Sequence, residues 1–197
     1  MSGWLGCGPR LNPCRASGAP LPSLEAIVAD YRSFAKERAL EDAYWADPRI
    51  DFTTAIHRAC SSIDRQNKRH SHQRRIPAHV LKHAGQTLAP HADELRSATD
   101  FDALHEAVER LLSDQLGVGP VQIYDFSARI GLWAGRHPTR VYLHAGVRIG
   151  AHNLGLQTVD RQWLALSEMP APLCDLKAAE VEDILCIYKA NFKNIAR

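Results

Sequence analysis

The first chemistry that the sequence suggests is the binding of an anion by exposed backbone. Gly117 and Gly119 flank Val118 in the stretch LGVGP, between two segments with helical periodicity. Glycine adopts backbone angles that other residues resist, and it lets another molecule approach closely. Pro120 suits the first turn of a following helix. The unpaired N–H groups of that turn and the positive end of the helix dipole favour an anion. The turn therefore predicts a phosphate contact, and an ordinary turn between two helices is the alternative.

A cluster of cations favours the phosphate interpretation. Residues 65–75 read RQNKRHSHQRR, with five Lys or Arg, two His and no acid. The formal net charge of the chain is +2 and this stretch contributes +5, so the remainder is near −3. A concentrated basic patch on a nearly neutral chain is typical of a surface that binds a polyanion. The predicted contacts with DNA are Lys68, Arg69, His72, Arg74 and Arg75. The alternative is a solvated loop.

Other classes of site find little support. The five cysteines are odd in number and include no CxxC pair, which argues against a disulfide framework, a structural zinc site or an iron–sulfur cluster. The spacing of His70, His72 and His79 is a poor fit to a metal site on a helix, so we expect no metal and no other cofactor. No apolar run approaches the length of a membrane span. The N-terminus lacks the features of a signal peptide. These observations predict a cytoplasmic protein without a membrane partner, and they identify no protein partner.

The hydrophobic pattern predicts an all-α fold. Apolar residues recur at helical spacing through most of the chain, and no convincing alternating run indicates a strand. We expect a disordered or loosely attached segment at 1–20, which is rich in Gly, Pro and Arg. A single domain of about seven to nine helices is predicted over residues 21–197.

Capping residues indicate where several helices begin. Ser23 is the predicted N-cap of a helix that runs through 24–45, and Thr99 or Asp100 caps the clearest helix, at 101–112. Further helices are predicted after Pro120 and after Pro138.

The stretch from Leu112 to Leu156 resembles the helix–hairpin–helix superfamily of base-excision DNA glycosylases. In that family an LxGVG-type hairpin is followed by a helix and a short loop. A second helix then begins with valine, aspartate and histidine and ends in an Arg-Leu-Gly-Leu-like motif. Here LGVG, VYLH at 141–144 and AHNLGL at 151–156 match these three parts, over about a quarter of the chain. The resemblance implies a protein that grips double-stranded DNA through the hairpin. It also implies excision of a flipped, damaged or modified base, in repair or in defence against modified foreign DNA.

Two positions depart from the family pattern. The catalytic aspartate of the family would fall at Tyr142 or Leu143, and the hairpin lysine of lyase-type members would fall near Val121 or Gln122. The cluster-binding cysteines of some members are also missing. Two hypotheses follow. Either a monofunctional glycosylase uses another carboxylate, or the chain is a non-catalytic DNA-binding relative. An all-α interaction protein, whose hairpin only packs, is a third possibility.

A displaced catalytic carboxylate could stabilise oxocarbenium charge or activate a water. Asp125 follows the hairpin, and its alternative role is a surface pair with Arg129. Glu182 and Asp183 are the second candidates, and their alternative role is a charged first turn of a helix. His144 could orient a water or contact a phosphate, and a buried structural histidine is its alternative. Gln73 is a candidate to enter the gap left by a flipped base, and Arg148 is a further predicted DNA contact.

Overall fold

The computed structural model describes residues 21–70 and 73–195, so the predicted loose segment 1–20 lies outside the described residues. The described chain is mostly helical, with one small two-stranded sheet, and this confirms the all-α prediction in its coarse form. It divides into two compact units, which we call the middle unit (37–137) and the terminal unit (21–36 with 138–195). Within the described ranges, no helix combines the length and apolar character that a membrane span requires.

The middle unit is a group of helices around one apolar core. Its helices are α2 (Ala35–Trp45), which begins just before the unit, α3 (Phe52–Ser61), α4 (Ala78–Leu88), α5 (Ala92–Ser97), α6 (Phe101–Leu112) and α7 (Pro120–Ala134). A single 3-10 turn, Ala89–His91, joins α4 to α5. Helix α3 packs against α4 and α7, and α6 packs against α7. The apolar faces predicted at helical spacing meet in this core, where Phe52, Ile56, Leu104, Val108 and Phe126 are fully buried.

Side chains cap the helices where the sequence predicts. The Ser23 hydroxyl accepts a hydrogen bond from the N–H of Ala26 at 3.3 Å, and Asp100 accepts one from Ala103 at 2.9 Å. Pro120 is the first residue of α7. These caps satisfy N–H groups that the first helical turn leaves without partners. Each prediction needed only local chemistry, and each is confirmed.

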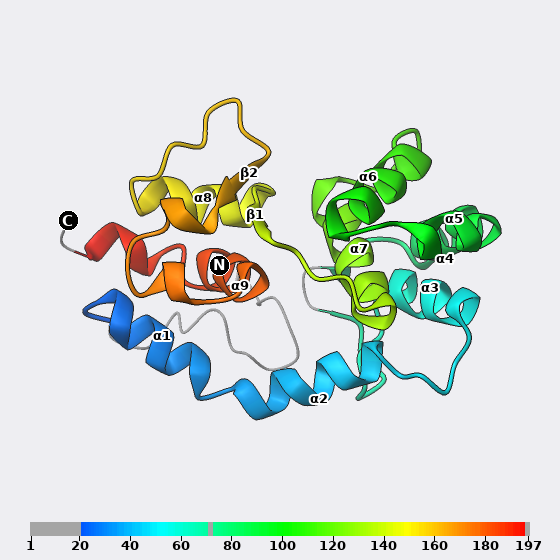
Figure 1. Cartoon of the computed structure of the whole chain (residues 1–197), viewed down its shortest axis with the longest axis horizontal. Coiled ribbons are helices and arrows are strands. Elements are labelled where there is room, and N and C mark those ends of the chain that lie inside the picture. The colour runs from blue at the N-terminus through cyan, green and yellow to red at the C-terminus, as the bar shows by residue number, and fades with distance from the viewer. Residues whose placement is uncertain (1–20, 71–72, 196–197) are drawn as a thin grey trace. The chain divides into compact units, whose positions relative to one another are not determined.

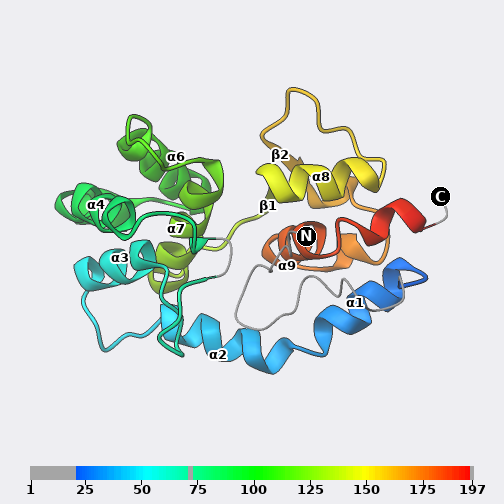
Figure 2. The same ribbon diagram turned by 180° about the vertical axis from the view of Figure 1, so that it is seen from behind.

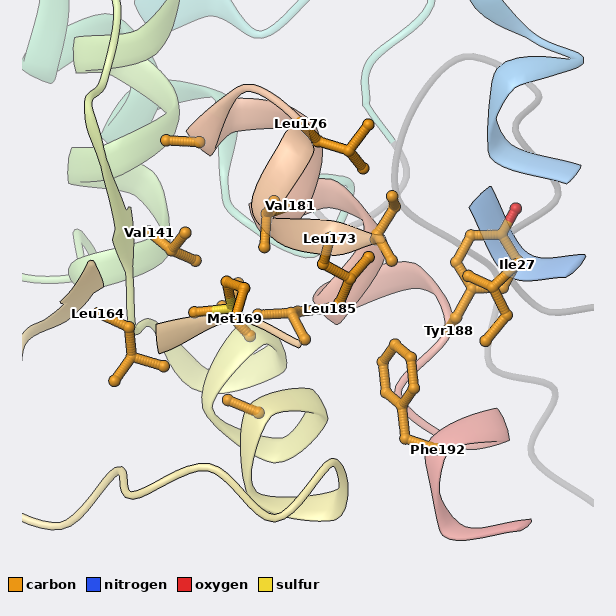
Figure 3. Packing of buried hydrophobic residues seen from close by; sticks show 14 of the residues in the cluster. Ile27, Val141, Leu164, Met169, Leu173, Leu176, Val181, Leu185, Tyr188 and Phe192 are labelled. Atoms are coloured by element: carbon orange, nitrogen blue, oxygen red, sulfur yellow. The ribbon is translucent and has the colours of Figure 1, made fainter. Parts of the chain in front are cut away.

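The terminal unit combines three helices with the sheet. Its elements are α1 (Leu24–Arg32), β1 (Arg140–Tyr142), α8 (Ala145–Asn153), β2 (Trp163–Ala165) and α9 (Ala178–Ile187), with 3-10 turns at Leu166–Glu168, Leu173–Asp175 and Asn191–Asn194. Helix α8 lies next to α9 in both views (Figures 1 and 2). Figure 3 shows the core that α1, α9 and the two strands share, including Ile27, Val141, Leu164 and Leu185.

Two glycines allow α8 and α9 to approach closely. A Cβ added at Gly146 would lie 2.6 Å from Cys186 Sγ, and one at Gly150 would collide with the backbone carbonyl of Leu185. A Cβ at Gly150 would require the backbone of α9 to move, so this position needs glycine, whereas a Cβ at Gly146 would require the Cys186 side chain to shift. The four-residue spacing places both glycines on one face of α8.

Two features of the terminal unit and its junction correct the sequence prediction. The helix predicted through 24–45 is interrupted at Ser33, whose hydroxyl donates to the carbonyl of Asp30 at 2.6 Å, and α2 begins at Ala35. A serine hydroxyl that binds a carbonyl one turn back competes with helix propagation. The helix predicted directly after Pro138 begins only at Ala145, because residues 140–142 form β1. Strand β1 pairs antiparallel with β2, twenty residues downstream, and that pairing leaves no local pattern.

Candidate nucleic-acid interface and carboxylate sites

The predicted glycine turn connects α6 to α7 and needs glycine at one of its two positions. Gly117 has φ +86°, in the left-handed region that favours glycine. Gly119 has φ −120° and ψ 179°, which any residue adopts. Its N–H donates to Gln122 Oε1 at 2.9 Å, so this group is already used within the chain. The first helical hydrogen bond runs from Ile123 N–H to the Gly119 carbonyl at 3.1 Å. The N–H groups of Val121 and Gln122 therefore precede the helical ladder.

This turn, residues 113–119, rests on the start of α4. The position of a Cβ on Gly117 would be 3.3 Å from Val80 Cγ1, and Gln115 Nε2 donates to the Val80 carbonyl at 2.8 Å. Leu116, at the tip, keeps 91% of its surface exposed. The exposed residues His79, Lys82 and His83 belong to α4, and the exposed Arg74 and Arg75 precede Ile76 and Pro77, which lead into it. The turn therefore contacts a helix that also carries solvent-exposed basic side chains.

The basic stretch belongs to a segment that is folded over its described residues, 62–70 and 73–76, and we call these residues the basic loop. The backbone N–H of Asp64 donates to the carbonyl of Lys68 at 2.8 Å, and the backbone N–H of His70 donates to the carbonyl of Ser62 at 3.0 Å. Arg65, Lys68, Arg74 and Arg75 are exposed along it. Arg69 is partly buried and donates through Nη1 to the carbonyl of Ile76 at 3.1 Å. His72 lies outside the described residues. These hydrogen bonds fix the backbone of the loop, from which the cationic side chains extend.

The loop is anchored by the side chain of Gln73. Gln73 is fully buried, and its Nε2 donates to Asp125 Oδ2 on α7. Its Oε1 accepts from Arg129 Nη1 at 3.4 Å. Because Gln73 has these internal partners and no exposed surface, we do not include it among the proposed DNA contacts.

Arg129 is the centre of this polar network in the middle unit. Its guanidinium is buried and donates to the Ala59 carbonyl at 3.1 Å and to Ser62 Oγ at 2.9 Å. It lies 3.8 Å from Asp125 Oδ2 and stacks over the Trp45 ring at 4.9 Å. Burial lowers the pKa of Arg129, and the Asp125 carboxylate opposes that shift. Asp125 therefore serves as the counter-ion of a buried cation, and this pairing restricts its use as a catalytic base.

His70 forms a second buried pair beside the same tryptophan. Its Nε2 lies 3.5 Å from the Glu41 carboxylate, and its ring centroid lies 5.9 Å from that of Trp45. Burial lowers the pKa of His70 below its ordinary value, because the charged form is poorly solvated there. Glu41 and Asp125 oppose that shift and Arg129 adds to it. The histidine is therefore a neutral anchor of the basic loop near neutral pH.

Acid is expected to destabilise the middle unit through His70. The unfolded state binds a proton near pH 6.5, whereas the folded state, with its lowered pKa, does so only at lower pH. The free energy of unfolding should therefore fall as the pH drops through this window, with a slope of up to about 1.4 kcal/mol per pH unit. Urea denaturation at pH 7.5, 6.5 and 5.5 measures the slope. His70→Gln should flatten it, and His83→Gln, at an exposed position of the same unit, should not. Equal slopes in all three proteins would refute this assignment.

In the terminal unit, the structure brings together two predicted residues that lie 38 positions apart in the sequence. His144 Nε2 lies 2.5 Å from Glu182 Oε1, and both side chains are about nine-tenths buried. His144 is the N-cap residue of α8, and Glu182 lies on α9. The two atoms are within hydrogen-bond distance. A buried carboxylate held by a histidine is an arrangement found in acid–base sites, and it also ties two helices together.

The neighbouring predicted residues have other partners. Asp183 Oδ2 accepts from the Tyr31 hydroxyl at 2.8 Å, which links α9 to α1. Arg148 donates to three backbone carbonyls, those of Leu143, Thr158 and Arg161. It therefore holds the 154–162 loop against α8. These hydrogen bonds give the Arg148 guanidinium a structural role.

Sequence reasoning missed two residues around Arg129 and His70, namely Glu41 and Trp45, and it did not predict that Arg129 is buried. Glu41 lies in α2, AKERALEDAYW, among other charged residues, so its burial leaves no local signal. The pair Asp125–Arg129 has the i, i+4 spacing of a surface ion pair.

Comparison with known proteins gives no match of any kind: no family model, no curated protein and no solved structure is similar to this chain.

Proposed function

We propose that this protein binds duplex DNA through the 113–119 turn and the cations beside it. The observation that carries the proposal is the docking of Gly117 on Val80 of α4. In this proposal the first N–H groups of α7 and the exposed cations Arg74, Arg75 and Lys82 contact the same duplex. Helix-start N–H groups and nearby cations are the two components of a non-specific phosphate grip. Asp114 is an exposed acid in the turn.

A pair of substitutions at Gly119 tests the proposal. Gly119→Glu should weaken duplex binding by about tenfold or more, because it places a carboxylate at the proposed phosphate position. Gly119→Ala is the matched control. The backbone at Gly119 suits any residue, and the nearest atom to a new Cβ is the movable Gln122 Oε1 at 3.3 Å. Fluorescence anisotropy with a labelled 20-base-pair duplex, at several salt concentrations, measures both effects. Unchanged affinity in Gly119→Glu would contradict the proposal.

Charge reversal beside the turn provides a second measure of the same contact. Arg74→Glu with Arg75→Glu should weaken binding and reduce the slope of log K against log salt by about 0.9 for each lost phosphate contact. Lys36→Glu with Lys193→Glu makes the same change in net charge at exposed positions of the terminal unit. This control should keep the wild-type slope. Equal losses in the two double variants would indicate a general charge effect and would count against a site at the turn.

Base excision is the second candidate function, and the His144–Glu182 pair favours it. In that proposal Glu182 is the displaced carboxylate, which stabilises positive charge on the sugar or activates a water. His144 keeps the carboxylate oriented through the 2.5 Å contact. Of the three carboxylates predicted from the sequence, Asp125 is engaged by Gln73 and Arg129, and Asp183 by Tyr31. Glu182 is the one that contacts a histidine, the side chain that most often acts as a general acid or base.

A further inference from the structure

The small sheet of the terminal unit has one buried face and one outward face. Val141 and Leu164 are directly opposite each other in the ladder and fully buried. Side chains alternate along a strand, so Arg140, Tyr142 and Trp163 belong to the other face. Tyr142 and Trp163 are themselves opposite each other in the register. This outward face, which we call the aromatic face, therefore carries two aromatic rings and a cation.

The contacts on the aromatic face suit a nucleobase. Trp163 is 36% exposed, and the Arg140 guanidinium carbon lies 4.5 Å from the centroid of its ring. Bases stack on tryptophan, tyrosine and arginine planes, and a neighbouring guanidinium attracts the phosphate backbone. The nearby Arg161 is paired with Glu168, so it offers little net charge. Asp160 is the exposed acid in the adjacent loop.

The size of the face also favours a base over a protein partner. Each strand has three residues, so the paired strands span about 10 Å by about 5 Å. A stable protein interface needs about 800 Å² on each partner, which is far more than this face offers. One or two stacked bases match it in area. The pairing of the two chain segments continues for one more residue, because Leu143 N–H donates to the Gln162 carbonyl at 2.8 Å. The next residue, His144, is the N-cap of α8. His144 is therefore the next residue in the chain after the end of this face.

We propose that the aromatic face is a stacking site for an unpaired base of single-stranded DNA, with Trp163 as the main platform and Arg140 as the phosphate contact. This site lies in the terminal unit and does not depend on the duplex contact at the 113–119 turn. It would add single-strand recognition to the chain, whether the base is flipped from a duplex or already unpaired.

Two substitutions of Trp163 with different stacking ability test the proposal. A labelled 12-nucleotide oligo(dT) is titrated with wild type and variants, and binding is followed by anisotropy. Trp163→Leu keeps an apolar side chain but removes the aromatic plane, and it should weaken binding by about tenfold, within the range measured for stacked bases. Trp163→Phe keeps a plane and should stay within about threefold of wild type. Val159→Ala, at another exposed apolar position of the same unit, is the control. Circular dichroism checks the fold of each variant.

Photo-crosslinking locates the contact directly. An oligo(dT) with one 5-bromodeoxyuridine should crosslink to Trp163 or Tyr142, as mapped by mass spectrometry. The result that would overturn the proposal is unchanged affinity in Trp163→Leu, or crosslinks confined to the middle unit. The Gly119→Glu variant separates the two DNA proposals. If Gly119→Glu loses duplex binding, and adding Trp163→Leu to that variant weakens its oligo(dT) binding, both sites stand. If Trp163→Leu has no effect while Gly119→Glu loses duplex binding, only the turn remains.

Discussion

Arg129→Met is expected to lower the free energy of unfolding of the middle unit by about 3–5 kcal/mol, because the change removes one partner of a buried charge pair. The Asp125 carboxylate would lose its cation, and the donors to Ala59, Ser62 and Gln73 would disappear together. Methionine fills much of the same volume, so lost packing contributes less than the lost hydrogen bonds. Urea denaturation followed by circular dichroism measures the change.

A second substitution shows whether the loss comes from the stranded carboxylate. Arg129→Met combined with Asp125→Leu should regain part of the stability, because replacing both members of a buried pair costs less than removing one. Arg75→Met, at an exposed position, is the control and should change stability by less than about 0.5 kcal/mol. A loss below about 1 kcal/mol in Arg129→Met would mean that the network does not hold the unit together.

The Arg129 network matters for function because it joins the elements of the proposed DNA contact. Gln73 belongs to the basic loop, Asp125 and Arg129 belong to α7, and Ala59 and Ser62 lie at the end of α3. Helix α7 begins at the 113–119 turn. The network therefore fixes the basic loop relative to the helix whose start we propose as the phosphate site. A preorganised cation set loses less conformational entropy on binding than a mobile one.

The parts of the fold that the sequence predicted correctly depend on local chemistry. The Ser23 and Asp100 caps, the start of α7 at Pro120 and the apolar stripe of α6 each involve residues within one or two helical turns. A side chain that caps a helix or repeats at helical spacing leaves its signal in a short window.

The parts that the sequence did not predict depend on distant partners. Strand β1 has three residues, too few for an alternating pattern, and it exists because β2 pairs with it. Glu182 lies in the acidic stretch EVED, which has the composition of a solvated first turn, yet the fold buries it against His144. Arg129 has the spacing of a surface partner for Asp125, and only the packing of α3 and Trp45 around it makes it central. Burial of a charged residue is set by tertiary contacts, so no local window reports it.

Glu182→Gln is expected to abolish the release of free base if the chain is a glycosylase. Removing the charge that stabilises the developing oxocarbenium ion should slow release by about 10²-fold or more. Glutamine keeps nearly the same shape and can still accept a hydrogen bond from His144, so the terminal unit should remain folded. The assay incubates the protein with duplexes that carry a panel of damaged and modified bases, and mass spectrometry detects the freed base.

Asp183→Asn is the matched control, because it makes the same loss of charge on the next residue of α9. Its side-chain oxygen can still accept the Tyr31 hydroxyl, so release should stay near the wild-type rate. Asp125→Asn tests the remaining carboxylate. If Asp125→Asn or Asp183→Asn loses release while Glu182→Gln keeps it, the aspartate whose change abolishes release is the catalytic carboxylate. Absence of release by the wild-type protein across the panel, with salt-sensitive duplex binding intact, would make His144–Glu182 a structural link between α8 and α9. The protein would then be a DNA binder without excision activity, because the 113–119 turn and the cations beside it do not involve Glu182.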